Sequence, residues 1–363
     1  MPILNRSKIR PDVLKIYDNG FKEQMTGVLE FLSREENKEF NFQTIYKKIT
    51  DANELFFKRE KKVEELTNLL TEKERRFMVN LLRHGFDYGA SLEQKKTPIP
   101  DDVKIEKIII NEIPAEWQIV PGADKERVLL YFHGGGWIMG SPNTCRLLTL
   151  ELAKVTKMRV LSVDYRLAPE HPFPAAVEDC VAAYKSLLSN DIKPENIIIA
   201  GDSAGGNLTL SSLIKLRDDG IPLPAGAIPI SPATDLSYVE DTSRLDDLSI
   251  KNGETDPILA DLGIFWWSYI YIAGANSQDP LISPLFGNLK GLPPILIQAS
   301  SCEILYSEIK RFYERAKKAG LDIELQTWDE MVHVFQGFGL HQLPEADEAF
   351  QKIGEYTKKI LNK

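Results

Sequence analysis

The spacing of apolar residues changes once along this chain, close to Pro98 and Pro100. Before these prolines, apolar residues recur every three or four positions, while Lys and Glu occupy the intervening positions. This spacing is typical of helices with one buried face. We therefore predict three or four amphipathic helices between Asn5 and Phe86, within an N-terminal helical segment that spans residues 1–97. The clearest series are Val13-Ile16-Tyr17-Phe21 and Ile45-Ile49-Ala52-Phe56.

From residue 98 onward, short apolar runs predict eight strands, and helical patterns separate the later ones. Strands that alternate with helices indicate a mostly parallel sheet with helices on both faces, which is an α/β fold. One stretch, about 236–275, is too long for a simple crossover. We expect it to be an insertion in the 98–363 domain that forms a helical cap together with residues 1–97. The strands are expected at 104–110, 117–120, 127–132, 159–163, 196–200, 226–230, 295–299 and 322–328, and the later helices at about 145–156, 174–189, 204–218, 303–319 and 344–361.

Composition narrows the class of protein without identifying it. The chain has 363 residues, 43% hydrophobic and 27% charged, as in ordinary globular proteins. Its net charge of −9 arises after residue 100, which argues against broad contacts with nucleic acid. The start has no apolar leader and no stretch reaches membrane-spanning length, so we expect a cytoplasmic protein. The three cysteines, Cys145, Cys180 and Cys302, are an odd number and lack the spacing of metal ligands, so we expect no disulfide framework.

The sequence Gly201-Asp202-Ser203-Ala204-Gly205 lies between an apolar run and a helical pattern. A strand that turns this abruptly into a helix forces its central residue into a strained conformation. Glycines two positions to either side remove side chains that would otherwise collide. This arrangement is the nucleophile elbow of serine hydrolases, and it predicts Ser203 as the nucleophile.

Three consecutive glycines, Gly134 to Gly136, follow the third predicted strand directly after His133. Such a run lets the backbone approach a ligand and direct its N–H groups toward it. No Lys and Ser/Thr follow, as a phosphate-binding P-loop would require. We predict an oxyanion hole formed by the amides of Gly134, Gly135 and Ala204.

The chain has five histidines, and one follows the last predicted strand. His333, in Met331-Val332-His333-Val334-Phe335, matches the order Ser, acid, His of α/β hydrolases. We therefore predict that it is the general base. The other four lie in the N-terminal helices, in Gly- or Pro-bound loops, or near the last helix: His84, His133, His171 and His341.

The acid is expected directly after the seventh predicted strand, where Glu303 is the first carboxylate. Its role would be to orient the imidazole and stabilise the protonated form. Glu308, one turn later, is expected to be solvated, and Asp322 is less well placed.

Two other segments are predicted to be structural. Residues 164–170, together with Glu178 and Asp179, are expected to form a turn and salt-bridge network. The alternative for this region is a metal site at His171, but the spacing matches no known ligand set. The aromatic run 265–271 is expected to be mostly core.

These motifs together resemble the hormone-sensitive-lipase-like carboxylesterases over residues 100–363. The resemblance rests on the segments 133–136, 201–206, 164–170 and 331–335, and 114–117 before 129–133 is similar to the esterase and lactone hydrolase branch. The family usually has Asp-Pro-Leu at the acid, where this chain has Glu303-Ile304-Leu305. The N-terminal region is also longer than the usual cap of the family.

The expected activity is hydrolysis of small-molecule carboxylic esters through an acyl-enzyme, with no cofactor or metal. The acyl chains are expected to be short to medium. The same residues could open a lactone or remove an acetyl group. Outside catalysis, the alternative is a ligand receptor of the same fold, against which the presence of His333 argues. A homo-oligomer, or a partner for the N-terminal helices, stays open.

Overall fold

One sheet of eight strands organises the computed structural model, which describes residues 4–362 apart from the side chains of residues 261, 262 and 264. The strand order is β1-β2-β4-β3-β5-β6-β7-β8. The pairs β1–β2 and β2–β4 are antiparallel and all later pairs are parallel. The strands are β1 Lys104–Ile110, β2 Ile113–Ile119, β3 Asp124–Phe132, β4 Met158–Val163, β5 Ile197–Asp202, β6 Gly226–Ile230, β7 Ile295–Ser300 and β8 Ile323–Trp328.

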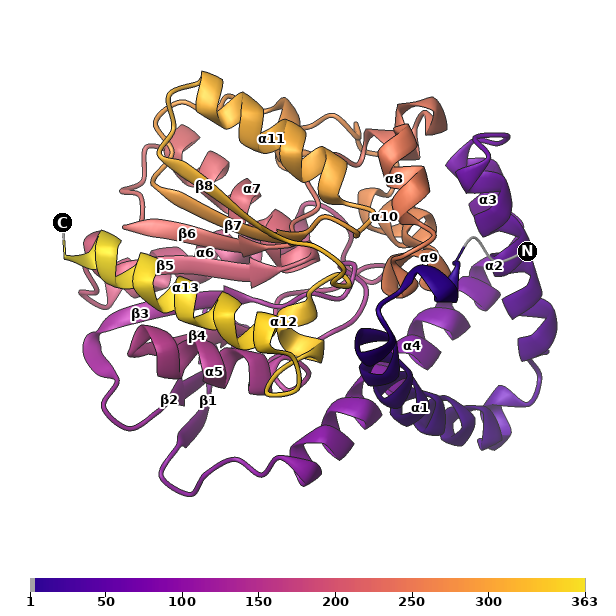
Figure 1. Ribbon diagram of the computed structural model, residues 1–363, viewed down its shortest axis with the longest axis horizontal. Coiled ribbons are helices and arrows are strands. Elements are labelled where there is room, and N and C mark those ends of the chain that lie inside the picture. Colours follow the sequence, from indigo (N-terminus) through magenta and orange to yellow (C-terminus); the bar gives the residue numbers. More distant parts are fainter. Residues whose placement is uncertain (1–3, 363) are drawn as a thin grey trace.

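Alternate side chains of each central strand enter different layers of the core. Along β3, Leu130 and Phe132 join one apolar cluster, whereas Leu129 and Tyr131 join the other. Because side chains of a strand alternate between the two faces, both faces need a cover. The cover of the Leu129 face is α5 (Arg146–Thr156) and α13 (Pro344–Leu361), and that of the opposite face is α6 (Ala175–Ser189), α7 (Ala204–Asp218) and α11 (Tyr306–Lys318) (Figure 1).

A second group of helices lies beside one end of the sheet (Figure 1). The N-terminal helices pack there on the helices between β6 and β7. Phe56 stacks on Phe265 with ring centroids 5.1 Å apart, and Asn53 donates a hydrogen bond to the carbonyl of Ala260. The N-terminal helices are α1 Pro11–Ser33, α2 Phe42–Phe57, α3 Val63–Thr67 and α4 Glu72–Lys96, and those of the insertion are α8 Asp247–Asn252, α9 Pro257–Leu262 and α10 Ile264–Ile272.

The predicted sheet is confirmed, and three strands extend two or more residues beyond their predicted bounds: β2 and β3 begin earlier, at Ile113 and Asp124, and β5 ends later, at Asp202. β2 begins at Ile113, although Pro114 cannot donate to a ladder. The carbonyl of Pro114 still accepts the amide of Asp164 at 2.9 Å, so this residue keeps its acceptor bond to the neighbouring chain. β5 continues to Asp202, at the start of the turn that carries Ser203.

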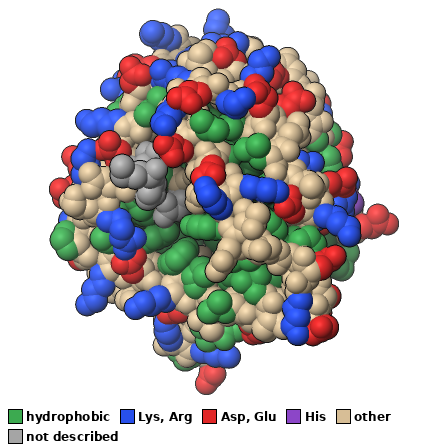
Figure 2. Space-filling view, turned by 90° about the vertical axis from the view of Figure 1, so that its right-hand side faces the viewer, with side chains coloured by type: hydrophobic (Ala, Val, Ile, Leu, Met, Phe, Trp, Pro, Cys, Tyr) green, Lys and Arg blue, Asp and Glu red, His purple; other side chains and the backbone are tan. Residues whose placement is uncertain are grey.

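Charges of both signs are interspersed on the face that carries the N-terminal helices, with apolar patches between them (Figure 2). This face therefore shows no broad basic surface. In the part of the chain that the structure describes, no helix combines the length and the apolar character needed to cross a membrane.

Candidate active site

The turn between β5 and α7 holds Ser203 in a conformation that its neighbours impose. Ser203 has φ 53° and ψ −115°, a region that residues with side chains rarely adopt. A Cβ atom on Gly201 would lie 2.4 Å from the carbonyl oxygen of Gly205, and one on Gly205 would lie 1.9 Å from that of Phe132. The glycine spacing is therefore a steric requirement of this turn, as the sequence predicts.

The imidazole of His333 lies between the Ser203 hydroxyl and a carboxylate. Its Nε2 is 2.9 Å from Ser203 Oγ, and its Nδ1 is 2.9 Å from Glu303 Oε2. Both contacts fit the neutral tautomer with the proton on Nδ1, in which Nδ1 donates to Glu303 and Nε2 accepts from the hydroxyl. The structure thus brings together three side chains that are 30 to 130 positions apart in the sequence.

Glu303 lies fully buried directly after β7, at 0% exposure. Its loop is joined to the histidine loop by Ser300, whose hydroxyl donates to the carbonyl of Met331 at 2.6 Å and accepts the Cys302 amide at 3.0 Å. The expectation for Glu308 is wrong. Glu308 is 5% exposed and accepts the Thr234 amide at 2.6 Å, because the first turn of α11 packs beneath the loop that follows β6.

Several charges act on the buried His333 ring. Burial alone would lower its pKa, but the hydrogen bond to Glu303 and the negative charges of Glu303, Asp256 and Asp202 outweigh this effect. The pKa of His333 is consequently raised above the ordinary value of the side chain. A raised pKa makes the ring a stronger acceptor for a serine proton.

One of the predicted oxyanion donors has a hydrogen-bond partner within the protein. The amide of Gly134 already donates to Asp202 Oδ1 at 2.9 Å, and the Tyr131 hydroxyl donates to the same oxygen at 2.5 Å. Since an N–H group serves one strong acceptor at a time, Gly134 holds the loop in place instead of facing a substrate. A Cβ atom at Gly134 would lie 2.2 Å from Asp202 Oδ2, so only glycine fits here.

Three neighbouring amides have no such partner. Among residues 4–362, the N–H groups of Gly135 and Gly136 donate no backbone hydrogen bond outside helices and strands, and Ala204 is the first residue of α7, where intrahelical partners are lacking. Gly135 has φ 119°, and a Cβ atom there would lie 2.2 Å from the Met139 carbonyl oxygen. Gly136, which the sequence prediction omitted, thus takes the place of Gly134 as a candidate donor.

His133, at the start of the glycine loop, is a structural residue. It is fully buried, its ring stacks on Tyr165 with centroids 4.2 Å apart, and its Nδ1 lies 2.8 Å from the Gly134 carbonyl oxygen. Burial lowers its pKa to about 4. It is therefore neutral near pH 7, and this low pKa makes it a much weaker base than His333.

Arg83 of α4 ties the N-terminal helices to the glycine loop. Its Nε donates to the Ile138 carbonyl at 2.6 Å, and its Nη2 donates to that of Ala168 at 2.9 Å. The same guanidinium forms a bidentate pair with Glu170 at 2.8 and 2.9 Å. One side chain of an N-terminal helix thus fixes the segment that follows the candidate oxyanion amides.

The two segments that were predicted to serve the fold form ion pairs and core contacts in the structure. Arg166 pairs with Asp179 at 2.8–3.0 Å, which confirms the salt-bridge network. Within the described chain, no group of three His, Cys, Asp or Glu side chains could hold a metal. The aromatic run is mostly buried, with Phe265, Trp266 and Tyr271 at 1–2% exposure, whereas Tyr269 is half-buried.

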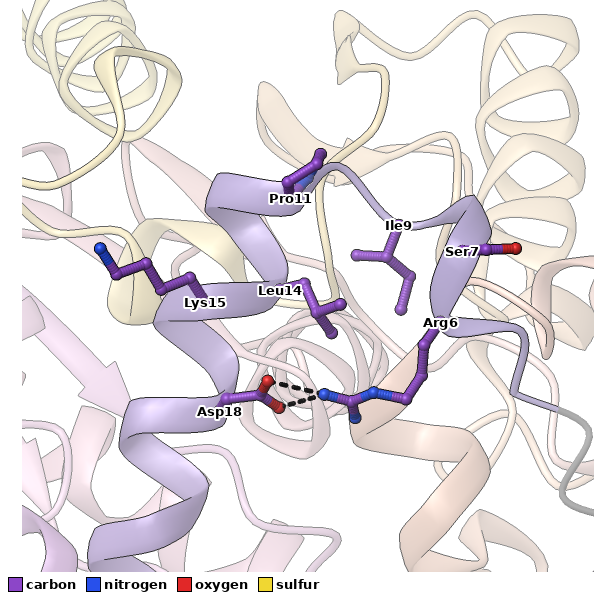
Figure 3. A pocket seen from close by; sticks show the side chains of 7 residues that line it. All are labelled: Arg6, Ser7, Ile9, Pro11, Leu14, Lys15 and Asp18. Atoms are coloured by element: carbon purple, nitrogen blue, oxygen red, sulfur yellow. Dashed lines mark hydrogen bonds and ion pairs between the residues drawn. The ribbon is translucent and has the colours of Figure 1, made fainter.

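A surface hollow of about 320 Å³ lies at the N-terminal turn, away from these residues (Figure 3). Arg6 and Asp18 form an ion pair at 2.5 Å along one side of it, and Ile9 and Leu14 lie beside this pair. None of the residues around it is a nucleophile paired with a base. The hollow therefore adds nothing to the chemistry of the Ser203 site.

Comparisons with known proteins agree with this geometry. Residues 129–337 match a protein family described by the α/β hydrolase fold. The acetyl-hydrolase of Streptomyces hygroscopicus is 39% identical over 261 residues, which cover 71% of this chain and 83% of that protein. An esterase of Acinetobacter venetianus is 36% identical over 244 residues, covering 67% of this chain and 78% of its own.

Solved structures give the same result. The crystal structure of an esterase from the bacterial hormone-sensitive lipase family is 36% identical, with a TM-score of 0.73, and covers 86% of this chain and 98% of that one. An esterase/lipase from an uncultured bacterium is 39% identical, with a TM-score of 0.71, and covers 78% and 92%. This chain therefore belongs to the hormone-sensitive-lipase-like carboxylesterases of the α/β hydrolase fold.

Proposed function

We propose that this carboxylesterase cleaves esters through an acyl-enzyme on Ser203. His333 removes the hydroxyl proton, and the serine oxygen attacks the ester carbonyl. Glu303 holds the ring and stabilises its protonated form. His333 then protonates the leaving alcohol, and water releases the acid by the same steps. The row of two 2.9 Å contacts from Ser203 through His333 to Glu303 carries this proposal.

The tetrahedral intermediate bears a negative oxygen, for which we propose three donors: the amides of Gly135, Gly136 and Ala204. Support comes from the Gly134 amide being bound to Asp202, and from the position of Ala204 at the start of α7. The partial positive charge of a helix N-terminus adds to such donors.

We further propose that the N-terminal helices and the 236–275 insertion form the cap over this site, and that short to medium acyl chains fit beneath it. The indole of Trp267, on α10, lies against Gly136, since a Cβ atom there would be 2.6 Å from its Cε3. Trp267 is itself 3% exposed. A bulky ring fixed beside the reacting carbonyl restricts the space for a long chain. The names of the relatives, acetyl-hydrolase and esterase, agree with this choice.

Opening of a lactone, or removal of an acetyl group, remains the second candidate activity, because the same donors and nucleophile serve these reactions. A receptor without catalysis is disfavoured by the contact of His333 with Ser203, which such a protein would not need.

Turnover of p-nitrophenyl esters from acetate to palmitate, together with a few lactones, tests the proposal. We expect activity to be highest on the shorter esters and to fall by about 10⁴-fold or more in Ser203→Ala. Equal activity of Ser203→Ala and the unmodified protein would refute the mechanism. A preference for palmitate would refute the proposed acyl range alone.

A further inference from the structure

The chain between α8 and α9 wraps around the loop that carries Glu303. Asn252 Nδ2 donates to the carbonyl of Ser301 at 2.9 Å and to that of Glu303 at 2.8 Å. The Thr255 hydroxyl donates to the carbonyl of Cys302 at 3.0 Å. Consecutive carbonyls of the acid loop are thus held by the insertion and not by the sheet that the loop leaves.

Asp256, which is 0% exposed, makes a further contact between this segment and the loop that carries Glu303. Its Oδ1 caps α9 by accepting the amides of Ile258 at 3.2 Å and Leu259 at 3.1 Å. Its Oδ2 accepts the amide of Ile304, next to Glu303, at 3.0 Å. A helix cap explains the first two bonds. It does not explain the third, which fixes the backbone beside the acid.

The charge of Asp256 acts on His333 across this buried region. The titratable groups that act on His333 are Glu303, Asp256 and Asp202, and all three are carboxyls that favour the protonated ring. Burial raises the pKa of Asp256 to about 6, and the charge of His333 opposes that rise. Asp256 is consequently ionised at the neutral and alkaline pH at which the enzyme would need a basic His333.

The outer side of the same segment is held by the N-terminal region. The amide of Asn5 donates to the carbonyl of Glu254 at 2.8 Å, and Lys8 forms an ion pair with the Glu254 side chain. The Tyr17 hydroxyl donates to the carbonyl of Pro257 at 3.3 Å. Asp256 therefore lies between the N-terminal helices and the three residues proposed to act on the ester.

We propose that Asp256 is a positioning residue for hydrolysis. Through the Ile304 amide it holds Glu303 against His333, and its negative charge stabilises the imidazolium that forms when Ser203 loses its proton. This inference rests on the proposed function of Ser203, Glu303 and His333.

The test is the pH profile of kcat/KM for p-nitrophenyl acetate in the full chain and in Asp256→Asn. We expect the acidic limb to move to lower pH in the variant, because the protonated ring loses a stabilising charge. We also expect kcat to fall by roughly 10-fold or more, since a small displacement of catalytic groups is costly. A residue needed for folding alone would leave the limb in place.

Asp246→Asn is the matched control. Asp246 caps α8 through the Ser249 amide at 2.8 Å and contacts the Ser307 hydroxyl of α11, but it is not among the carboxyls that act on His333. We expect this variant to keep the acidic limb of the unmodified protein. Asp256→Ser, which keeps a capping oxygen and removes the charge, should reproduce the shift of Asp256→Asn.

The proposal would be overturned if either variant, Asp256→Asn or Asp256→Ser, had its acidic limb at the same pH as the unmodified protein. So would unfolding of both Asp256 variants while Asp246→Asn stays folded, because Asp256 would then serve the fold. Failure of the proposed function would give a different result: the unmodified protein itself would show no acidic limb, or Ser203→Ala would retain turnover.

Discussion

The carboxylate of Asp202 accepts the amide of Gly134 at 2.9 Å, which joins the residue before the nucleophile to the first glycine of the neighbouring loop. The nucleophile elbow and the glycine loop are therefore one hydrogen-bonded unit, although 68 positions separate these two residues. This bond also leaves Gly135 and Gly136 as the amides that can turn toward a substrate.

Breaking this bond should slow catalysis, and removal of the Asp202 charge should also lower the pKa of His333. We expect Asp202→Ala to lower kcat by about 100-fold, close to the loss of one oxyanion donor, because the glycine loop is released. In Asp202→Asn the remaining carbonyl oxygen can still accept from Gly134 and Tyr131, so the loss should be smaller. Steady-state kinetics with p-nitrophenyl butyrate would measure both.

Tyr131→Phe is the control for this pair, since it removes the second donor to Asp202 and leaves the bond to Gly134. We expect kcat close to that of the unmodified protein. Equal kcat values for Asp202→Ala and Tyr131→Phe would show that the bond to Gly134 has no part in catalysis.

The pH dependence of hydrolysis follows from the environment of His333. The ring must be neutral to accept the serine proton, and its pKa is raised in the folded protein. Activity should therefore be present at alkaline pH and be lost as the pH falls through this raised pKa. The acidic limb of kcat/KM should lie above the ordinary histidine value of about 6.5.

His133 should contribute no step to this profile, because its pKa is about 4 and its ring is buried. Activity that stays constant down to pH 4 would argue against a histidine base. An acidic limb well below pH 6 would argue against the charged surroundings described for His333.

Arg83 offers a test of the coupling between the N-terminal helices and the glycine loop. We expect Arg83→Met to lower kcat/KM by roughly 10-fold, because the carbonyls of Ile138 and Ala168 lose their common donor and the loop gains freedom. Arg76→Met on the same helix removes an exposed pair with Glu72 and a charge that acts on Glu170, but no hydrogen bond to Ile138 or Ala168, so its effect should be much smaller.

Circular dichroism of both variants would show whether α4 is retained. If Arg83→Met matches Arg76→Met in kcat/KM, the N-terminal helices do not position the loop.

Local patterns predict most of this fold, because each element repeats its own period. The strand at Ile295 and the helix that begins at Ala204 could both be placed within about one residue, since each is bounded by residues that favour turns or caps. The start of β2 could not be predicted because Pro114 is unfavourable in a strand, and its carbonyl bond to Asp164 depends on the tertiary structure.

The site was predicted as far as order along the chain allows. Ser203, Glu303 and His333 follow the ends of the parallel strands β5, β7 and β8, so their convergence could be expected. The bond of the Gly134 amide to Asp202 could not be predicted, because no sequence pattern tells which amide of a glycine run already has a partner. Asp256 was missed because its contact with Ile304 joins two loops 48 positions apart.

A covalent label measures the central claim directly. The intact mass of the protein after treatment with a fluorophosphonate should increase by one adduct, and peptide mapping should place that adduct on Ser203. His333→Ala should be labelled far more slowly, and Ser203→Ala should not be labelled at all. An adduct on any other residue, or labelling of Ser203→Ala at an unchanged rate, would contradict the assignment of Ser203 as the nucleophile.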